Sequence, residues 1–213
     1  TVRRAEAQEA ARILGAKFYP PVVNDMTLTF DIEVMRKVAA VIRQSRADIV
    51  LTHALSDYME DHMACARLAT SAAFTHGMPN FDTVPPAPTY AHDVTIYHAM
   101  PHGLRTPLRQ KVRAGLYVDV GPVQDQARKA LAAHASQKDW LDKSQGMDSY
   151  LHTLDKMSAA VGALSGKYAL AQGWCRHHHL GYSASEIDPL RSALGSDCVV
   201  DAVYEAALEH PLP

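Results

Sequence analysis

The 213-residue sequence has few cysteines and no concentration of like charge. Its three cysteines, Cys65, Cys175 and Cys198, are odd in number and lack CxxC spacing, which argues against a disulfide framework and a thiolate zinc cluster. With 21 basic and 23 acidic residues, the chain shows no electrostatic signature of nucleic-acid or membrane binding. We therefore expect reduced thiols, a cytoplasmic location, no nucleic-acid or membrane partner, and a small neutral or polar ligand.

Long apolar runs and phosphate-binding glycine motifs are also missing. No apolar run reaches the ~18 to 20 residues needed to cross a bilayer. Neither GxGxxG nor GxxxxGK[ST] occurs, which argues against a nucleotide-binding α/β domain. The sequence thus predicts neither a membrane-spanning helix nor a glycine-rich phosphate-binding loop.

Helical and strand-like segments alternate along the first part of the chain. Apolar residues recur at helical spacing over residues 2–14, 31–46 and 61–74, and Gly15 follows the first of these as a C-cap. Strands are predicted over residues 48–53, 94–97 and 116–120. This alternation predicts one α/β domain over residues 1–213, with a Rossmann-like, mostly parallel sheet flanked by helices.

The remaining segments are predicted to be loop and helix. Four prolines between Pro79 and His92 predict an ordered surface loop. Helices are predicted from about Pro122 to Ser136 and from about Met147 to Ala171. We expect residues from about 140 to 213 to form a helical C-terminal extension that covers a pocket or contacts another copy in a homo-oligomer.

Polar side chains gather directly after the predicted strand 48–53. The loop holds the carboxylates Asp57, Glu60 and Asp61, and His62 opens the next helix. Ligands of open α/β sheets bind beyond the carboxyl ends of the strands, so this loop is a candidate site. Carboxylates are equally expected at a helix N-terminus for capping alone, and a single histidine is equally expected to be structural. Both interpretations remain open on spacing.

The order of several motifs resembles that of the LmbE/PIG-L deacetylase family. The strand-like run before His53, followed by Asp57-x-x-x-Asp61-His62, resembles the family's second signature, in which a strand leads into an Asp-His pair. The other similar segments are Arg3-Arg4-Ala5-Glu6-Ala7 through Leu14-Gly15, Tyr117-Val118-Asp119-Val120, and Lys129 to Gln137 with its His-x-Ser-Gln ending. Together they span most of residues 3–137. The resemblance implies a zinc-dependent hydrolase that removes an acyl group, usually acetyl, from an amino sugar or related amide.

The resemblance also implies roles for individual residues. Zinc is the expected cofactor and His62 its ligand, because the family's signature histidine ligates zinc. Asp61 is expected to orient a ring or a ligand from behind the site, as a catalytic-site carboxylate. The catalytic residues expected from the resemblance are therefore Asp61 and, as the donor to the oxyanion, His134.

The donor to the oxyanion is the least determined role. Some family members have a histidine three residues before the ligand, where this chain has Met59. His53, Tyr58 and His134 are the candidates, and His134 is preferred because it belongs to a matching motif. The substrate-binding residues expected are Arg3, His53, Asp57, Tyr58 and His98.

One family motif is missing from the sequence. No His-Pro-Asp-Asp occurs, although this first signature supplies two of the three zinc ligands and the general base in the family. We expect an upstream segment to carry it in the intact protein. A complete chain without that segment would instead be a catalytically inactive binding module of the same fold. The triple His177-His178-His179 is a disfavoured candidate for a second metal site, because neighbouring side chains point apart by ~100° in a helix or ~180° in a strand and cannot all face one ion.

Overall fold

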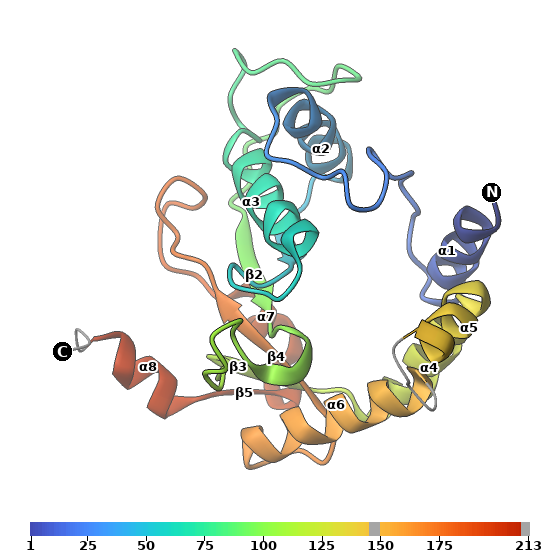
Figure 1. Ribbon diagram of the computed structural model, residues 1–213. Coiled ribbons are helices and arrows are strands. Elements are labelled where there is room, and N and C mark those ends of the chain that lie inside the picture. Colours follow the sequence, from blue (N-terminus) through green and yellow to red (C-terminus); the bar gives the residue numbers. More distant parts are fainter. Residues whose placement is uncertain (145–149, 210–213) are drawn as a thin grey trace. The chain divides into compact units, whose positions relative to one another are not determined.

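The computed structural model describes residues 1–144 and 150–209 (Figure 1). The chain divides into two compact units, which are described separately. The first unit comprises Thr1–Pro20 and Val118–Gln172, and the second comprises Pro21–Tyr117 and Gly173–Pro213. Among the described residues, no helix is both long and apolar enough to cross a bilayer. The single LmbE-like domain predicted over residues 1–213 stays a prediction.

The helices and strands follow the predicted alternation in the first part of the chain. The strands are β1 (Ile49–Thr52), β2 (Thr95–Ala99), β3 (Leu116–Asp119), β4 (Ala171–Arg176) and β5 (Cys198–Val200). The helices are α1 (Val2–Ile13), α2 (Ile32–Ser45), α3 (Glu60–Phe74), α4 (Gln124–Ala132), α5 (Ala135–Ser144), α6 (Tyr150–Ser165), α7 (Pro189–Leu194) and α8 (Ala202–Leu208). Short 3-10 turns occupy His102–Leu104, Gly121–Val123 and Gly195–Asp197.

The strands form one sheet in the order β1-β2-β4-β3-β5. β1 and β2 are parallel, with Thr52 opposite His98, so their carboxyl ends meet at one edge of the sheet. β4 runs antiparallel to β2 and places Cys175 opposite His98. The predicted α/β fold is confirmed, and the sheet contains an antiparallel pair.

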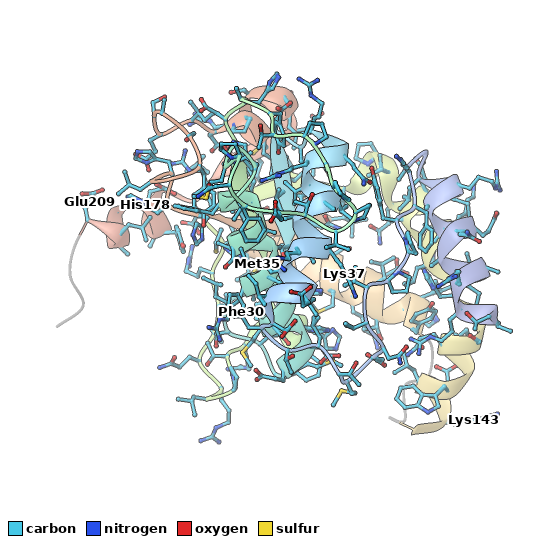
Figure 2. The ribbon with its side chains drawn as sticks, turned by 90° about the horizontal axis from the view of Figure 1, so that it is seen from above. Phe30, Met35, Lys37, Lys143, His178 and Glu209 are labelled. Carbon is cyan, nitrogen blue, oxygen red and sulfur yellow. The ribbon has the colours of Figure 1, made fainter. Side chains whose placement is uncertain are left out.

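In the second unit, α2 and α3 lie side by side (Figure 1). Asp31 caps α2, because its carboxylate accepts hydrogen bonds from the amides of Glu33 and Val34. The helix ends at Arg46 in the left-handed conformation, with φ of 51°. Figure 2 shows Met35 and Lys37 on α2 and Phe30 just before it. Small and apolar side chains from α2, α3, β1 and β2 form the core, among them Ala39, Ile42, Val50, Ala72, Ala73 and Ile96.

In the first unit, the helix predicted from about Pro122 to Ser136 is divided into two. α4 ends at Ala132 and α5 begins at Ala135. The Tyr150 hydroxyl donates to the carbonyl oxygen of Leu131 at 2.6 Å, and the carbonyl oxygen of His134 lies 3.2 Å from it. The Leu131 carbonyl also accepts from the amide of His134, and the His134 carbonyl accepts from the amides of Gln137 and Lys138.

Two segments that resemble the family meet within the first unit. Glu6 on α1 accepts hydrogen bonds from the amide and the hydroxyl of Ser136, at 2.9 and 2.7 Å. These two bonds lower the pKa of Glu6. Glu6 thus supplies a negative group at the N-terminus of α5, where the helix dipole favours one. Gly15 follows α1 with φ of +66°, the conformation expected of the predicted C-cap glycine.

The prediction of a helical extension from about 140 to 213 needs correction. The expected helix start at Met147 lies outside the described residues, and α6 ends at Ser165 rather than Ala171. β4 and β5 were not predicted at all. A Cβ added at Gly173 in β4 would lie 2.4 Å from the sulfur of Met100 and 2.8 Å from the Cβ of Ala114, so the close packing there favours glycine. A strand built around such a glycine lacks the apolar alternation from which strands are predicted.

Candidate functional site

A hydrogen-bonded aspartate and histidine lie after β1, with Asp57 in the loop that leads into α3 and His62 in the first turn of α3. Asp57 is 3% exposed, and its Oδ1 lies 2.9 Å from Nδ1 of His62. Oδ1 also accepts the amide hydrogen of Met59, at 3.1 Å. Because an ionised carboxylate only accepts, Nδ1 of His62 carries the proton and Nε2 of the neutral ring keeps its lone pair. A buried carboxylate therefore fixes both the tautomer and the orientation of His62.

Two further rings of this loop surround His62. The His53 ring stacks on it, with centroids 4.3 Å apart and an angle of 4° between planes. Tyr58, which is 64% exposed, lies edge-on to His62 with centroids 5.6 Å apart. Burial lowers the pKa of His53, and the neighbouring His62 lowers it further, while Asp57 acts in the opposite direction. The predicted substrate-binding residues His53, Asp57 and Tyr58 are thus brought together with the predicted ligand.

Asp61 makes a different contact from the one expected. Its Oδ2 accepts the amide hydrogen of Met26, at 2.7 Å, so it holds the loop that precedes α2. The carboxylate that orients the His62 ring is therefore Asp57 rather than Asp61. The reason is geometric: residues at i and i+1 of a helix start point in different directions, whereas Asp57 lies in the loop that turns back towards His62.

A second histidine pair lies at the end of β2. His98 is 6% exposed; its Nδ1 lies 2.8 Å from the carbonyl oxygen of His53, and its Nε2 lies 3.0 Å from Nδ1 of His177. Burial lowers the pKa of His98. Burial also lowers the pKa of His177, as do the neighbouring His98 and His178. His98 was predicted to line a site, whereas His177 was considered only as part of the triple histidine and set aside, because its partner is apparent only once β4 is paired with β2.

A pocket of about 350 Å³ opens beside this second pair. Its lining comes from the loop after β1, the end of β2 and the end of β4. The lining includes Leu55, His98, Met100, Val112, Cys175 and His177. His178, in the loop after β4 (Figure 2), also contributes. The pocket and the Asp57–His62 pair therefore share the loop that follows β1.

The remaining predicted site residues lie in the first unit. Arg3 is an exposed residue of α1. His134 lies between α4 and α5, two residues before the Ser136 that Glu6 contacts. Their roles stay predictions.

The fit to a metal was tested on the donor set of this chain. His62 fits one ligand position, because a histidine that ligates a metal commonly donates its other ring hydrogen to a carboxylate, as His62 does to Asp57. Within residues 1–144 and 150–209, no group of three or more His, Cys, Asp or Glu side chains gathers closely enough to hold an ion. His62 is thus a single fitting donor and not a complete ligand set.

The fold is shared with several solved structures. The conserved protein TT1542 of Thermus thermophilus matches with a TM-score of 0.62 and 22% identity, over 88% of this chain and 78% of that one. N,N'-diacetylchitobiose deacetylase of Pyrococcus horikoshii matches with a TM-score of 0.63 and 22% identity, over 89% and 68%. GalB, the 4-carboxy-2-hydroxymuconate hydratase of Pseudomonas putida, matches with a TM-score of 0.62 and 23% identity, over 88% and 75%. At these identities, the likeness establishes the fold.

The family model "PIG-L: GlcNAc-PI de-N-acetylase" matches residues 1–73. This range contains α1, α2, β1 and the loop with Asp57 and His62, and it ends within α3. The resemblance expected from the motif order is thereby confirmed over residues 1–73.

Proposed function

We propose that the protein is a zinc-dependent hydrolase that removes an N-acyl group, typically acetyl, from an amino sugar or a related amide. The observation that carries this proposal is the Asp57–His62 hydrogen bond, which lies inside the segment that matches the family model. The pair stands beyond the carboxyl end of β1, where open α/β sheets bind their ligands.

Zinc would be held by His62 through Nε2, the ring atom that Asp57 leaves free. When bound, zinc polarises an amide carbonyl and lowers the pKa of a bound water towards ~7. Asp57 keeps the ring in the tautomer that can bind a cation. His62 supplies one ligand of the set.

The other residues of the loop are proposed to contact the substrate. His53 and Tyr58 flank His62 and would form the walls beside the reacting amide. His98 would contribute to substrate binding as part of the wall of the pocket that it lines.

Arg3 and His134 keep the roles that the family resemblance implies. His134 is proposed to donate a hydrogen bond to the tetrahedral oxyanion, and Arg3 to bind a hydroxyl or phosphate of the substrate. We further propose that the protein is located in the cytoplasm, where the three cysteines would stay reduced, as they are in the structure. We also propose that it forms a homo-oligomer.

The test is acetate release by the intact protein, supplied with zinc, from N-acetylglucosamine and related N-acetyl amides. Zinc-dependent acetate release that His62→Ala abolishes and Glu60→Gln leaves unchanged is expected, because Glu60 is an exposed neighbour on the same helix. A full-length protein that contains no zinc as purified, binds none when zinc is added and releases no acetate would contradict the proposal. That result would favour a catalytically inactive binding module.

A further inference from the structure

The His98–His177 pair has hydrogen positions that its partners determine. The carbonyl oxygen of His53 can only accept, so Nδ1 of His98 must be the donor in that 2.8 Å contact. His98 is neutral, because it is buried and no carboxylate contacts it in the hydrogen bonds of the described residues. A neutral ring that is protonated at Nδ1 has an unprotonated Nε2. Nε2 of His98 is therefore an acceptor.

The same reasoning fixes the tautomer of His177. Its Nδ1 lies 3.0 Å from the accepting Nε2 of His98, so Nδ1 of His177 is the donor. Nε2 of a neutral His177 then carries a lone pair. This atom is absent from the buried, unpartnered side-chain atoms of the described residues, so it reaches solvent. The main-chain carbonyl of His53 thus determines the tautomer of His98, and His98 in turn determines that His177 has an unprotonated Nε2 open to solvent.

The chemistry of the surrounding pocket limits what His177 can bind. Leu55, Met100 and Val112 give the pocket of about 350 Å³ apolar walls. The guanidinium of Arg176, also in the lining, already donates to the carbonyl of Ile187 and the carboxylate of Glu186. An apolar pocket with a neutral acceptor fits a neutral ligand that has an apolar part and an N–H or O–H donor.

We propose that this pocket binds the substrate and that Nε2 of His177 accepts a hydrogen bond from its N–H or hydroxyl group. His98 is a positioning residue that acts through His177. The substrate class, an N-acylated amino sugar or amide, rests on the proposed function. The pocket is placed to receive such a substrate because it is lined by Ala54, Leu55 and Ser56, which lead into the Asp57–His62 segment.

NMR of protein with nitrogen-labelled histidine tests the tautomer without depending on activity. His177 and His98 are both expected to be protonated at Nδ1 and unprotonated at Nε2. In His98→Phe, His177 loses its acceptor and is expected to populate both tautomers. The control His152→Phe, at an exposed histidine on α6, should leave the His177 signals unchanged. A wild-type His177 protonated at Nε2 would overturn the inference.

Binding of N-acetylglucosamine tests the role of the pocket. Addition of this probe is expected to shift the Nε2 signal of His177, and His177→Phe is expected to weaken its binding about 2- to 10-fold, as for one neutral hydrogen bond. In His177→Gln the amide oxygen can replace the acceptor, so part of the affinity should return. Equal affinity in wild type and His177→Phe would overturn the inference.

Failure of the proposed function gives a different result. Binding that shifts His177 without acetate release would support the pocket and contradict the deacetylase. Acetate release with a KM that is unchanged in His177→Phe would support the deacetylase and overturn the role of His177.

Discussion

The second unit contains two histidine pairs that differ in the group that holds them. Asp57, a buried carboxylate, holds His62, whereas a neutral main-chain carbonyl holds His98 and through it His177. A buried carboxylate that accepts from Nδ1 leaves Nε2 of His62 free beside a negative charge, so His62 suits a cation. The second pair has a main-chain carbonyl and no carboxylate as its partner, so His177 suits hydrogen bonding to a neutral group. The same residue type is thus prepared for two kinds of chemistry by its partner.

His53 connects the two pairs. Its ring stacks on His62, and its carbonyl oxygen accepts from His98. A change in the main chain at the end of β1 would therefore affect both pairs, whereas a side-chain change in one pair should leave the other intact.

Removal of His62 is expected to have the largest effect. His62→Ala deletes the ring that Asp57 orients, so acetate release should fall to the background rate, while NMR should still show His177 protonated at Nδ1. Activity is measured by acetate release at saturating substrate. Activity close to wild type in His62→Ala would show that the first pair has no chemical role.

Neutralising Asp57 is expected to have an intermediate effect. In Asp57→Asn the ring loses its charged partner, and zinc affinity should fall about 10- to 100-fold, the usual cost of losing such a partner. Zinc affinity is measured by competition with a chelator. Glu60→Gln removes a carboxylate from the same segment but is exposed, so it should not alter the affinity. An equal loss in both variants would mean that net charge, and not the hydrogen bond, matters.

Breaking the second pair is expected to affect stability. His98→Phe leaves the His53 carbonyl and Nδ1 of His177 without partners, which should cost about 1 to 3 kcal/mol in the free energy of unfolding. Urea denaturation measures this cost, with His152→Phe as the matched histidine replacement. Unaltered stability in His98→Phe would indicate that water replaces both hydrogen bonds.

The pH dependence of stability should be the smallest effect. Burial lowers the pKa of His98 and of His177, so the unfolded state takes up protons first as pH falls below the ordinary value of ~6.5. Above that value both states are neutral at these rings and the free energy of unfolding does not depend on them. Below it the free energy of unfolding declines until the pH reaches the lowered pKa values of the folded state. Urea unfolding at pH 8, 6 and 5 checks this, and His177→Phe should show a shallower decline. A decline of equal slope in both proteins would assign it to other groups.

Much of this architecture could be predicted from the sequence because its signals are local. Asp31 and Arg46 bound α2 close to the predicted limits, and the short apolar run before His53 is β1. The loop with Asp57 and His62 was also expected, from a motif that follows a strand.

The parts that were missed depend on contacts between distant residues. β4 is built around Gly173, which packs against Met100, so its sequence carries no alternation. Tyr150 and Glu6, both distant in sequence, make hydrogen bonds to residues beside the break between α4 and α5. The exchange of roles between Asp57 and Asp61 depends on the path of the loop, which residue spacing does not encode.

The most direct test of the central claim follows the His62 ring while zinc is added to the intact protein. In the wild type, NMR of nitrogen-labelled histidine should show zinc shifting Nε2 of His62 while Nδ1 stays protonated through its hydrogen bond to Asp57. The His177 signals should change little. A His62 ring whose Nε2 signal does not respond to saturating zinc would contradict the account.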